Sequence, residues 1–132
     1  MKKDIPFDKV KEVAIAIVPS HNTDEEWSVY LINLQPKKLS NLLVTSKGYG
    51  VLDDREVETS TLRKLFEQID GKSANKIEPI HKELFGLTNE FWISYWVDGQ
   101  VYDKKYVFVQ ESIVEENLTH IPILNTKGVM IK

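Results

Sequence analysis

The chain has three histidines, and histidine is the side chain most often used as a metal ligand or as a general base near neutral pH. His21, His81 and His120 stand far apart in the sequence. Asp24 follows His21 and Glu83 follows His81, but neither spacing matches a two-ligand metal motif. We therefore expect the histidines to lie in turns or on the surface, and we expect no metal site.

Two glycines flank Tyr49. A phosphate-binding loop needs a lysine and a hydroxyl residue after its glycines and a helix directly behind it, and residues 48–50 meet neither requirement. Because glycine permits positive φ, the pattern predicts a bulge or tight turn after a strand. Tyr49 is then a candidate contact residue at the tip of a loop, and no cofactor is expected.

Hydroxyl and carboxylate side chains are concentrated in residues 53–61. The hydroxyl run 59–61 has no paired base and no G-x-S-x-G elbow, so helix capping explains it better than nucleophilic catalysis does. We expect the acidic segment 53–58 to form a solvated loop, and we expect disorder only there and in residues 1–4. With no acid and base paired, the sequence predicts no catalytic residue and a protein that is not an enzyme.

Aromatic and basic side chains alternate near the middle of the second half of the chain. When aromatic rings and lysines share one face of a sheet, they are suited to bind a partner protein or to stack bases. The commoner use of such rings is to fill the core while the lysines extend outward. The sequence therefore offers one candidate contact surface, formed by Trp92, Trp96, Lys105 and Tyr49.

Residues 91–109 must position that surface. Two runs rich in aromatic and β-branched residues flank Asp98-Gly99, a pair typical of a two-residue type I′ hairpin turn. In this register one face is the more apolar and is predicted to be the core face, and a slip of one residue would exchange the two faces. The predicted core face carries Phe91, Ile93, Tyr95, Val97, Tyr102 and Tyr106, and the other carries Trp92, Ser94, Trp96, Val101, Asp103 and Lys105.

Two segments carry helix signals. In residues 60–71 apolar side chains recur at helical spacing between a Ser/Thr pair and a glycine, so a helix is favoured over a strand. Residues 112–115 fit a capping box, which predicts a short helix through Leu118. The remaining periodic segments are β-like, and Pro79 limits one of them to a sheet edge or a strand end. These segments are 13–18, 27–34, 39–46, 76–80, 121–124 and 129–131.

Seven short β segments joined by turns predict a mainly β, single-domain protein built as an antiparallel β-sandwich with one or two short helices. An immunoglobulin-like arrangement fits the count of strands. The alternative is an α+β fold in which the 60–71 helix packs on an antiparallel sheet. The domain is expected to span residues 1–132.

Composition excludes several classes of protein. The absence of cysteine removes disulfides, thiolate metal sites and cysteine nucleophiles. A formal charge of -3 gives no general attraction to nucleic acid or to anionic lipid. Residues 13–18 form too short an apolar run for a secretion signal or a membrane span. We therefore expect a soluble cytoplasmic protein that does not bind a membrane and whose overall charge does not favour nucleic acid as a partner.

Four segments of the chain resemble a group of small, uncharacterised bacterial proteins whose members sometimes carry the label phenylalanyl-tRNA synthetase alpha subunit. The segments are 43–50, 59–63, 76–80 and 101–105. The residues do not support that label, because the arginine-bearing ATP motifs of a class II synthetase are absent and the chain is much shorter than such a core. The resemblance implies no activity and no site.

The leading hypothesis from the sequence is a protein-interaction domain that acts through surface contacts. A second is an accessory factor for RNA or the translation machinery, and a third is an unrecognised hydrolase with a polar cleft. The sequence does not determine the partner or the oligomeric state.

Overall fold

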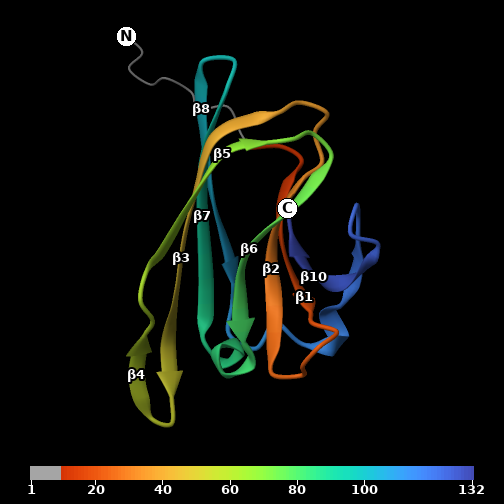
Figure 1. Ribbon diagram of the computed structural model, residues 1–132. Helices are drawn as coiled ribbons and strands as arrows, with labels where there is room; N and C mark the ends of the chain where they lie inside the picture. The colour runs from red at the N-terminus through yellow and green to blue at the C-terminus, as the bar shows by residue number, and fades with distance from the viewer. Residues whose placement is uncertain (1–9) are drawn as a thin grey trace.

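The computed structural model describes residues 10–132, and Figure 1 shows that they form two packed antiparallel sheets. The prediction of a β-sandwich is confirmed. Sheet A has the strand order β6-β2-β1-β10-β9. Its strands are β1 (Val13–Pro19), β2 (Glu26–Asn33), β6 (Ser73–His81), β9 (Thr119–Ile121) and β10 (Thr126–Ile131).

Sheet B has the strand order β4-β3-β7-β8, and β5 also pairs with β3. The long strand β3 holds β5 along its first half and β4 along its second half. The strands of sheet B are β3 (Leu39–Leu52), β4 (Arg55–Glu58), β5 (Leu62–Ile69), β7 (Thr88–Val97) and β8 (Gln100–Phe108). Two short 3₁₀ turns, η1 (Lys82–Gly86) and η2 (Glu115–Asn117), complete the described elements.

The hairpin of β7 and β8 has the predicted register and the predicted turn. Trp92 lies opposite Lys105 and Trp96 opposite Val101. Asp98 and Gly99 have φ values of 49° and 78°, and a type I′ turn requires positive φ at both positions. The predicted core face is confirmed, because five of its side chains are buried or half-buried between the sheets beside Phe91.

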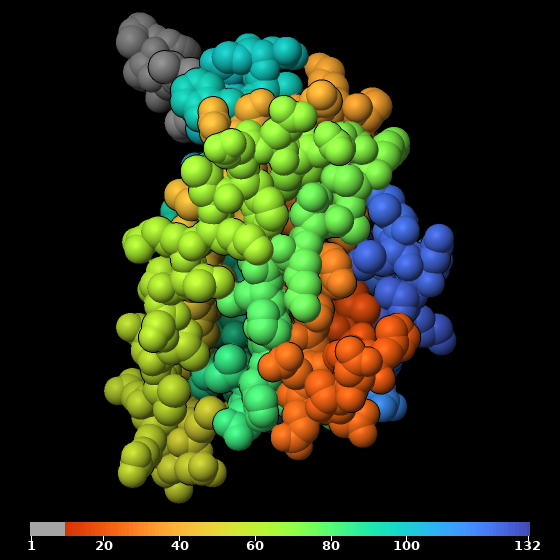
Figure 2. Space-filling model, in the orientation of Figure 1, coloured from red at the N-terminus to blue at the C-terminus, as the bar shows by residue number. Residues whose placement is uncertain are grey.

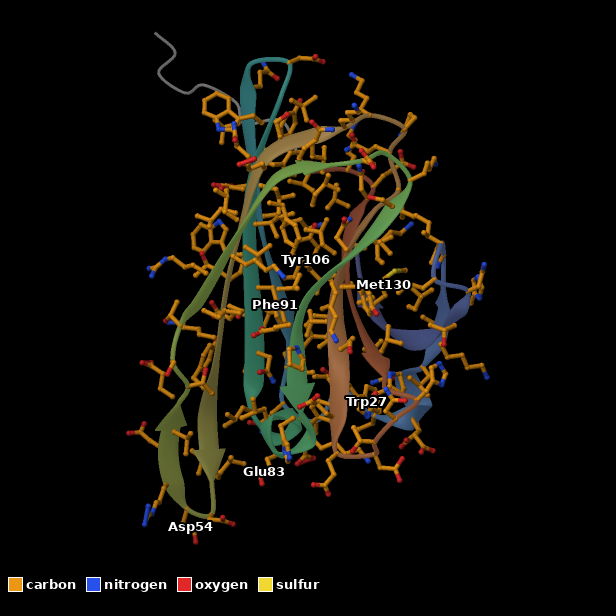
Figure 3. All side chains as sticks on the ribbon, in the orientation of Figure 1. Trp27, Asp54, Glu83, Phe91, Tyr106 and Met130 are labelled. Atoms are coloured by element: carbon orange, nitrogen blue, oxygen red, sulfur yellow. The ribbon has the colours of Figure 1, made fainter. Side chains whose placement is uncertain are left out.

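Strand β1 is buried along both of its faces, as predicted from its apolar run. Val13, Ile15 and Ile17 join the main core between the sheets. Figure 3 shows Phe91 and Tyr106 in this layer, and the hydroxyl of Tyr106 donates a hydrogen bond of 2.6 Å to the carbonyl oxygen of Val13. Sheet B is therefore tied to sheet A by a buried polar contact as well as by apolar packing.

The predicted helix at residues 60–71 is wrong, and the segment forms β5. The apolar side chains that recur at helical spacing do not all pack into the core, because Leu62 and Leu65 are 41% and 59% exposed. Instead the backbone of β5 pairs with β3 from Ser46 to Leu39, which satisfies its N–H and C=O groups. The α+β alternative is therefore wrong, since residues 10–132 contain no α-helix.

The predicted break at residues 48–50 is also wrong, because β3 continues through these residues to Leu52. The chain reverses later, at Asp53-Asp54, where both residues have positive φ. Arg55–Glu58 then pairs with Tyr49–Leu52, so the acidic segment 53–58 is a hairpin and not the expected disordered loop. The prediction of disorder for residues 1–4 lies outside the described residues.

The capping box predicted at residues 112–115 is wrong as well. Only the 3₁₀ turn η2 forms there, and its N-cap residue Val114 makes no side-chain capping bond. In contrast, the segment 76–80 forms part of β6, which is an edge strand of sheet A, as Pro79 required. No helix within residues 10–132 combines the length and apolar character needed to cross a membrane.

Candidate functional site

The four predicted contact residues, Trp92, Trp96, Lys105 and Tyr49, all lie on the outer face of sheet B. The strand registers place them on this face, which we call the tryptophan face. Trp92 and Trp96 are 48% and 46% exposed, whereas Tyr106, on the opposite face of β8, is buried. The two tryptophan rings therefore do not fill the core, which was the commoner expectation for such residues.

A chain of polar contacts organises one end of the tryptophan face. The ammonium of Lys105 lies 5.5 Å from the centre of the Trp92 ring and 4.0 Å from Oε1 of Glu90. The hydroxyl of Tyr49 donates a hydrogen bond of 2.6 Å to Oε2 of the same glutamate. This hydrogen bond, together with partial burial and the negative charge of Glu90, raises the pKa of Tyr49. Lys105 is thereby held over the indole ring, and the carboxylate is satisfied by two neighbours.

The sequence pattern predicted Tyr49 at the tip of a loop, and this prediction is wrong. Tyr49 lies within β3, opposite Glu58 on one side and Thr88 on the other. Alternation along β3 directs it outward, while Gly48 faces inward. A side chain at Gly48 would place its Cβ 2.9 Å from Oδ1 of Asn89, so close packing explains this glycine.

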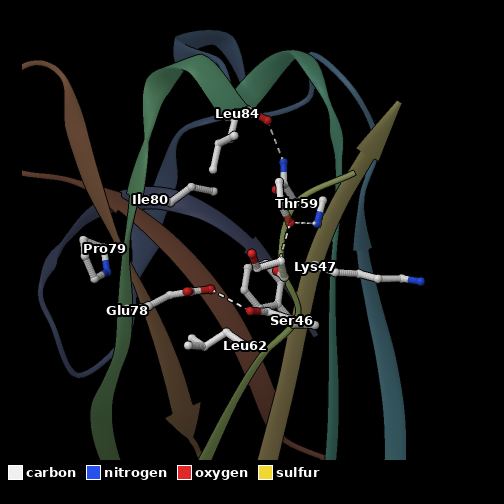
Figure 4. Close-up of a pocket in the computed structure, with 12 residues that line it drawn as sticks. Ser46, Lys47, Thr59, Leu62, Glu78, Pro79, Ile80 and Leu84 are labelled. Carbon is white, nitrogen blue, oxygen red and sulfur yellow. Dashed lines mark hydrogen bonds between the residues drawn. The ribbon is translucent and has the colours of Figure 1, made fainter. Parts of the chain in front are cut away.

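A second feature is a cavity of about 350 Å³ between the two sheets. It opens along the side where β6 of sheet A faces β3 of sheet B and the connection between β4 and β5, and Figure 2 shows it as a hollow between the green and yellow-green atoms. Figure 4 shows its lining at close range. The lining includes Ser46, Thr59, Leu62, Glu78, Ile80 and Leu84.

Glu78 points from β6 into this cavity (Figure 4). Its Oε2 accepts a hydrogen bond of 2.9 Å from the hydroxyl of Ser46, which belongs to the opposite sheet. Burial raises the pKa of Glu78, although the Ser46 hydrogen bond and the positive charge of Lys64 both act to lower it. The carboxylate is therefore held in a less polar setting than water, which costs free energy when it is charged.

A β-bulge explains why this glutamate faces inward. The register between β6 and β2 shifts between Val29 and Tyr30, which leaves Ile77 as the extra residue on β6. Both Ile77 and Ile80 are buried although they are three positions apart, an odd spacing that a regular strand cannot bury on one face. Sequence reasoning missed Glu78, and this odd spacing was the signal that could have found it.

The histidines do not meet at a site. His21 and His120 are exposed. His81 precedes η1, where its Nδ1 accepts a hydrogen bond of 3.2 Å from the backbone N–H of Glu83. Within residues 10–132 no group of three or more histidine, aspartate or glutamate side chains is placed to hold a metal ion.

Comparisons of the chain with models of protein families, with curated proteins and with solved structures found no match. The resemblance to small bacterial proteins and the immunoglobulin-like arrangement therefore both stay predictions.

Proposed function

We propose that the protein is a protein-interaction module whose contact surface is the tryptophan face. The observation that supports this most directly is the half-exposure of Trp92 and Trp96 on one face of the same strand. Tryptophan is the residue most enriched among those that dominate binding energy at protein interfaces. Large rings left in water on a flat sheet face are typical of a surface that a partner covers.

The charges around Trp92 define the chemistry of the partner. Arg63, Thr45, Trp92 and Lys105 form one row across four strands, so Lys105 is the direct neighbour of Trp92 on one side and Arg63 lies beyond Thr45 on the other. Glu90 is already satisfied by its two neighbours. We therefore propose a partner surface that presents apolar side chains to the rings and carboxylates to the flanking cations.

The proposal assigns no catalytic role to the protein. The hydroxyl of Ser46 donates to a carboxylate, and the hydroxyl of Thr59 donates to the carbonyl oxygen of Ser60. Thr59 has no base beside its hydroxyl, the group beside the Ser46 hydroxyl is the carboxylate of Glu78, and no histidine is among the described residues that line the cavity. The cytoplasmic location remains a prediction from the sequence.

The test is site-specific crosslinking in cells that produce the protein. A photo-crosslinking side chain at Thr45 lies on the tryptophan face, and one at Ser28 on the outer face of sheet A is the matched control. We expect a protein to be trapped from Thr45 and not from Ser28. We also expect Trp92→Ala to weaken capture about tenfold or more while Trp92→Phe retains it. Equal capture from both positions, or no effect of Trp92→Ala in a folded variant, would refute the proposal.

A second candidate function is binding of RNA by the same face. The position of Lys105 over the Trp92 ring favours it, because an aromatic ring can stack on a base while a neighbouring lysine binds a phosphate. A gel-shift assay with tRNA at low salt tests this candidate. Binding that weakens steeply with added salt and is lost in Trp92→Ala would support it. The absence of any shift at low salt would exclude it.

A further inference from the structure

We propose that the cavity between β6 and β3 binds a small organic cation, a primary ammonium on an apolar body, with Glu78 as its counter-ion. This site lies between the sheets, whereas the tryptophan face lies on the outside of sheet B. The two proposals can therefore succeed or fail separately. A volume of about 350 Å³ falls within the range of small-molecule sites in proteins.

The carboxylate of Glu78 forms no ion pair with the described residues. Only one of its oxygens, Oε2, receives a hydrogen bond from the described residues, and that bond comes from a neutral hydroxyl. Lys64, whose positive charge acts on Glu78, donates hydrogen bonds to the backbone carbonyl oxygens of Lys76 and Ile77, each at 3.3 Å. Lys64 thus covers the free edge of β6, and no ion pair with Glu78 forms within residues 10–132.

Two other polar side chains of the cavity wall, Thr59 and Asn89, are occupied by hydrogen bonds to the backbone. Oγ1 of Thr59 accepts from the backbone N–H of Gly48 at 2.8 Å and donates to a backbone carbonyl. Nδ2 of Asn89 donates to the carbonyl oxygens of Leu84 and Leu87. Figure 4 shows Lys47 directed away from the cavity. The carboxylate of Glu78 is therefore the charged group that is left for a ligand.

The other walls of the cavity favour an apolar body behind that charge. Leu62, Ile80, Leu84 and Phe91 contribute apolar surface, and Phe91 and Ile80 are buried. An ammonium group could donate to Oε1 of Glu78 and to the oxygen of Ser46, whose own proton points at Oε2. A neutral or anionic ligand of the same size would leave the carboxylate without compensation.

The hydroxyl-bearing segment 59–61 lies beside this site. It connects β4 to β5, and the backbone N–H of Thr59 donates a hydrogen bond of 2.9 Å to the carbonyl oxygen of Gly48. Thr59 and Ser60 both line the cavity, so this connection forms part of its rim. Ser60 is exposed at this rim, which allows it to be replaced without disturbing the core.

The test is titration of the full-length protein with phenethylamine, followed by ligand-detected NMR and calorimetry. Phenethyl alcohol and phenylpropionate are the neutral and anionic controls, and an N-acetyl-lysine amide tests whether a lysine side chain of a peptide is the natural source of the ammonium. We expect the amine to bind at least tenfold more tightly than either control. Equal binding of the amine and the alcohol, or no binding of either amine, would overturn the proposal.

Two variants and a matched control locate the site. We expect Glu78→Gln, which keeps a hydrogen-bond acceptor for Ser46, to fold and to lose amine binding at least tenfold. Ser60→Trp should block the rim and reduce binding similarly without touching the carboxylate. Glu83→Gln removes an exposed acid on the adjacent turn η1 and should bind like the unaltered protein. Unchanged affinity in Glu78→Gln and Ser60→Trp, or a tenfold loss in Glu83→Gln, would show that the amine binds elsewhere.

Discussion

Replacing Tyr106 by phenylalanine removes one hydroxyl from the interior and leaves the aromatic ring in place. That hydroxyl donates a hydrogen bond of 2.6 Å to the carbonyl oxygen of Val13, across the space between the sheets. Tyr106 is 1% exposed, so water cannot replace the lost donor. A buried hydrogen bond contributes about 0.5–1.5 kcal/mol, and an acceptor left without a partner costs somewhat more. We expect Tyr106→Phe to lower the free energy of unfolding by about 1–2 kcal/mol.

Thermal and urea unfolding measure this change. With an unfolding entropy of about 2.1 cal/mol/K per residue, a loss of ~1–2 kcal/mol lowers the Tm of a 132-residue chain by about 4–7 °C. The control is Tyr30→Phe, because the half-buried Tyr30 hydroxyl makes no hydrogen bond with any residue in the range 10–132. Its effect should stay below about 0.5 kcal/mol. Equal small effects in both variants would refute the argument that the Tyr106 hydroxyl ties the sheets together.

Two other measurements test the described packing. Burial, followed by the effect of Tyr102, raises the pKa of Tyr95 to about 12, and burial also raises that of Tyr106. A pKa raised on folding gives stability that is complete below the unfolded pKa of about 10 and is lost as the pH rises through the folded value. The Tm should therefore fall between pH ~10 and ~12, together with the appearance of tyrosinate absorbance. Ionisation of all tyrosines with the unperturbed tyrosine pKa of about 10 would contradict this. Gly71→Ala should lower the free energy of unfolding by about 2–3 kcal/mol, because the new Cβ would clash with the carbonyl oxygen of Pro36. A Tm within 1–2 °C of the original, which corresponds to about 0.5 kcal/mol, would show that this turn relaxes to accept the methyl group.

The hairpin of residues 91–109 was fixed by local chemistry. Asp98-Gly99 accepts positive φ at both turn positions, and the turn sets the register of every later pair. Because side chains alternate along a strand, that register alone placed Trp92 and Trp96 on one face and Tyr106 on the other. Three contact residues on one face of the hairpin could thus be named before the structure, whereas Tyr49 was expected in a loop and reaches the same face only through the pairing of β3 with β7.

The cavity and strand β5 depended on contacts between distant segments. Residues 60–71 have a helical spacing of apolar side chains, but pairing with β3 satisfies the backbone, and nothing in the local pattern reports the presence of that neighbour. The inward turn of Glu78 follows from a bulge opposite Val29, a residue nearly fifty positions earlier in the chain. The sequence alone therefore determined the turn at Asp98-Gly99 and the alternating faces of its two strands, which depend on φ and on neighbouring residues. The tertiary structure decided which edges pair and which carboxylate lies partly buried between the sheets, because those free energies arise only when strands far apart in the chain meet.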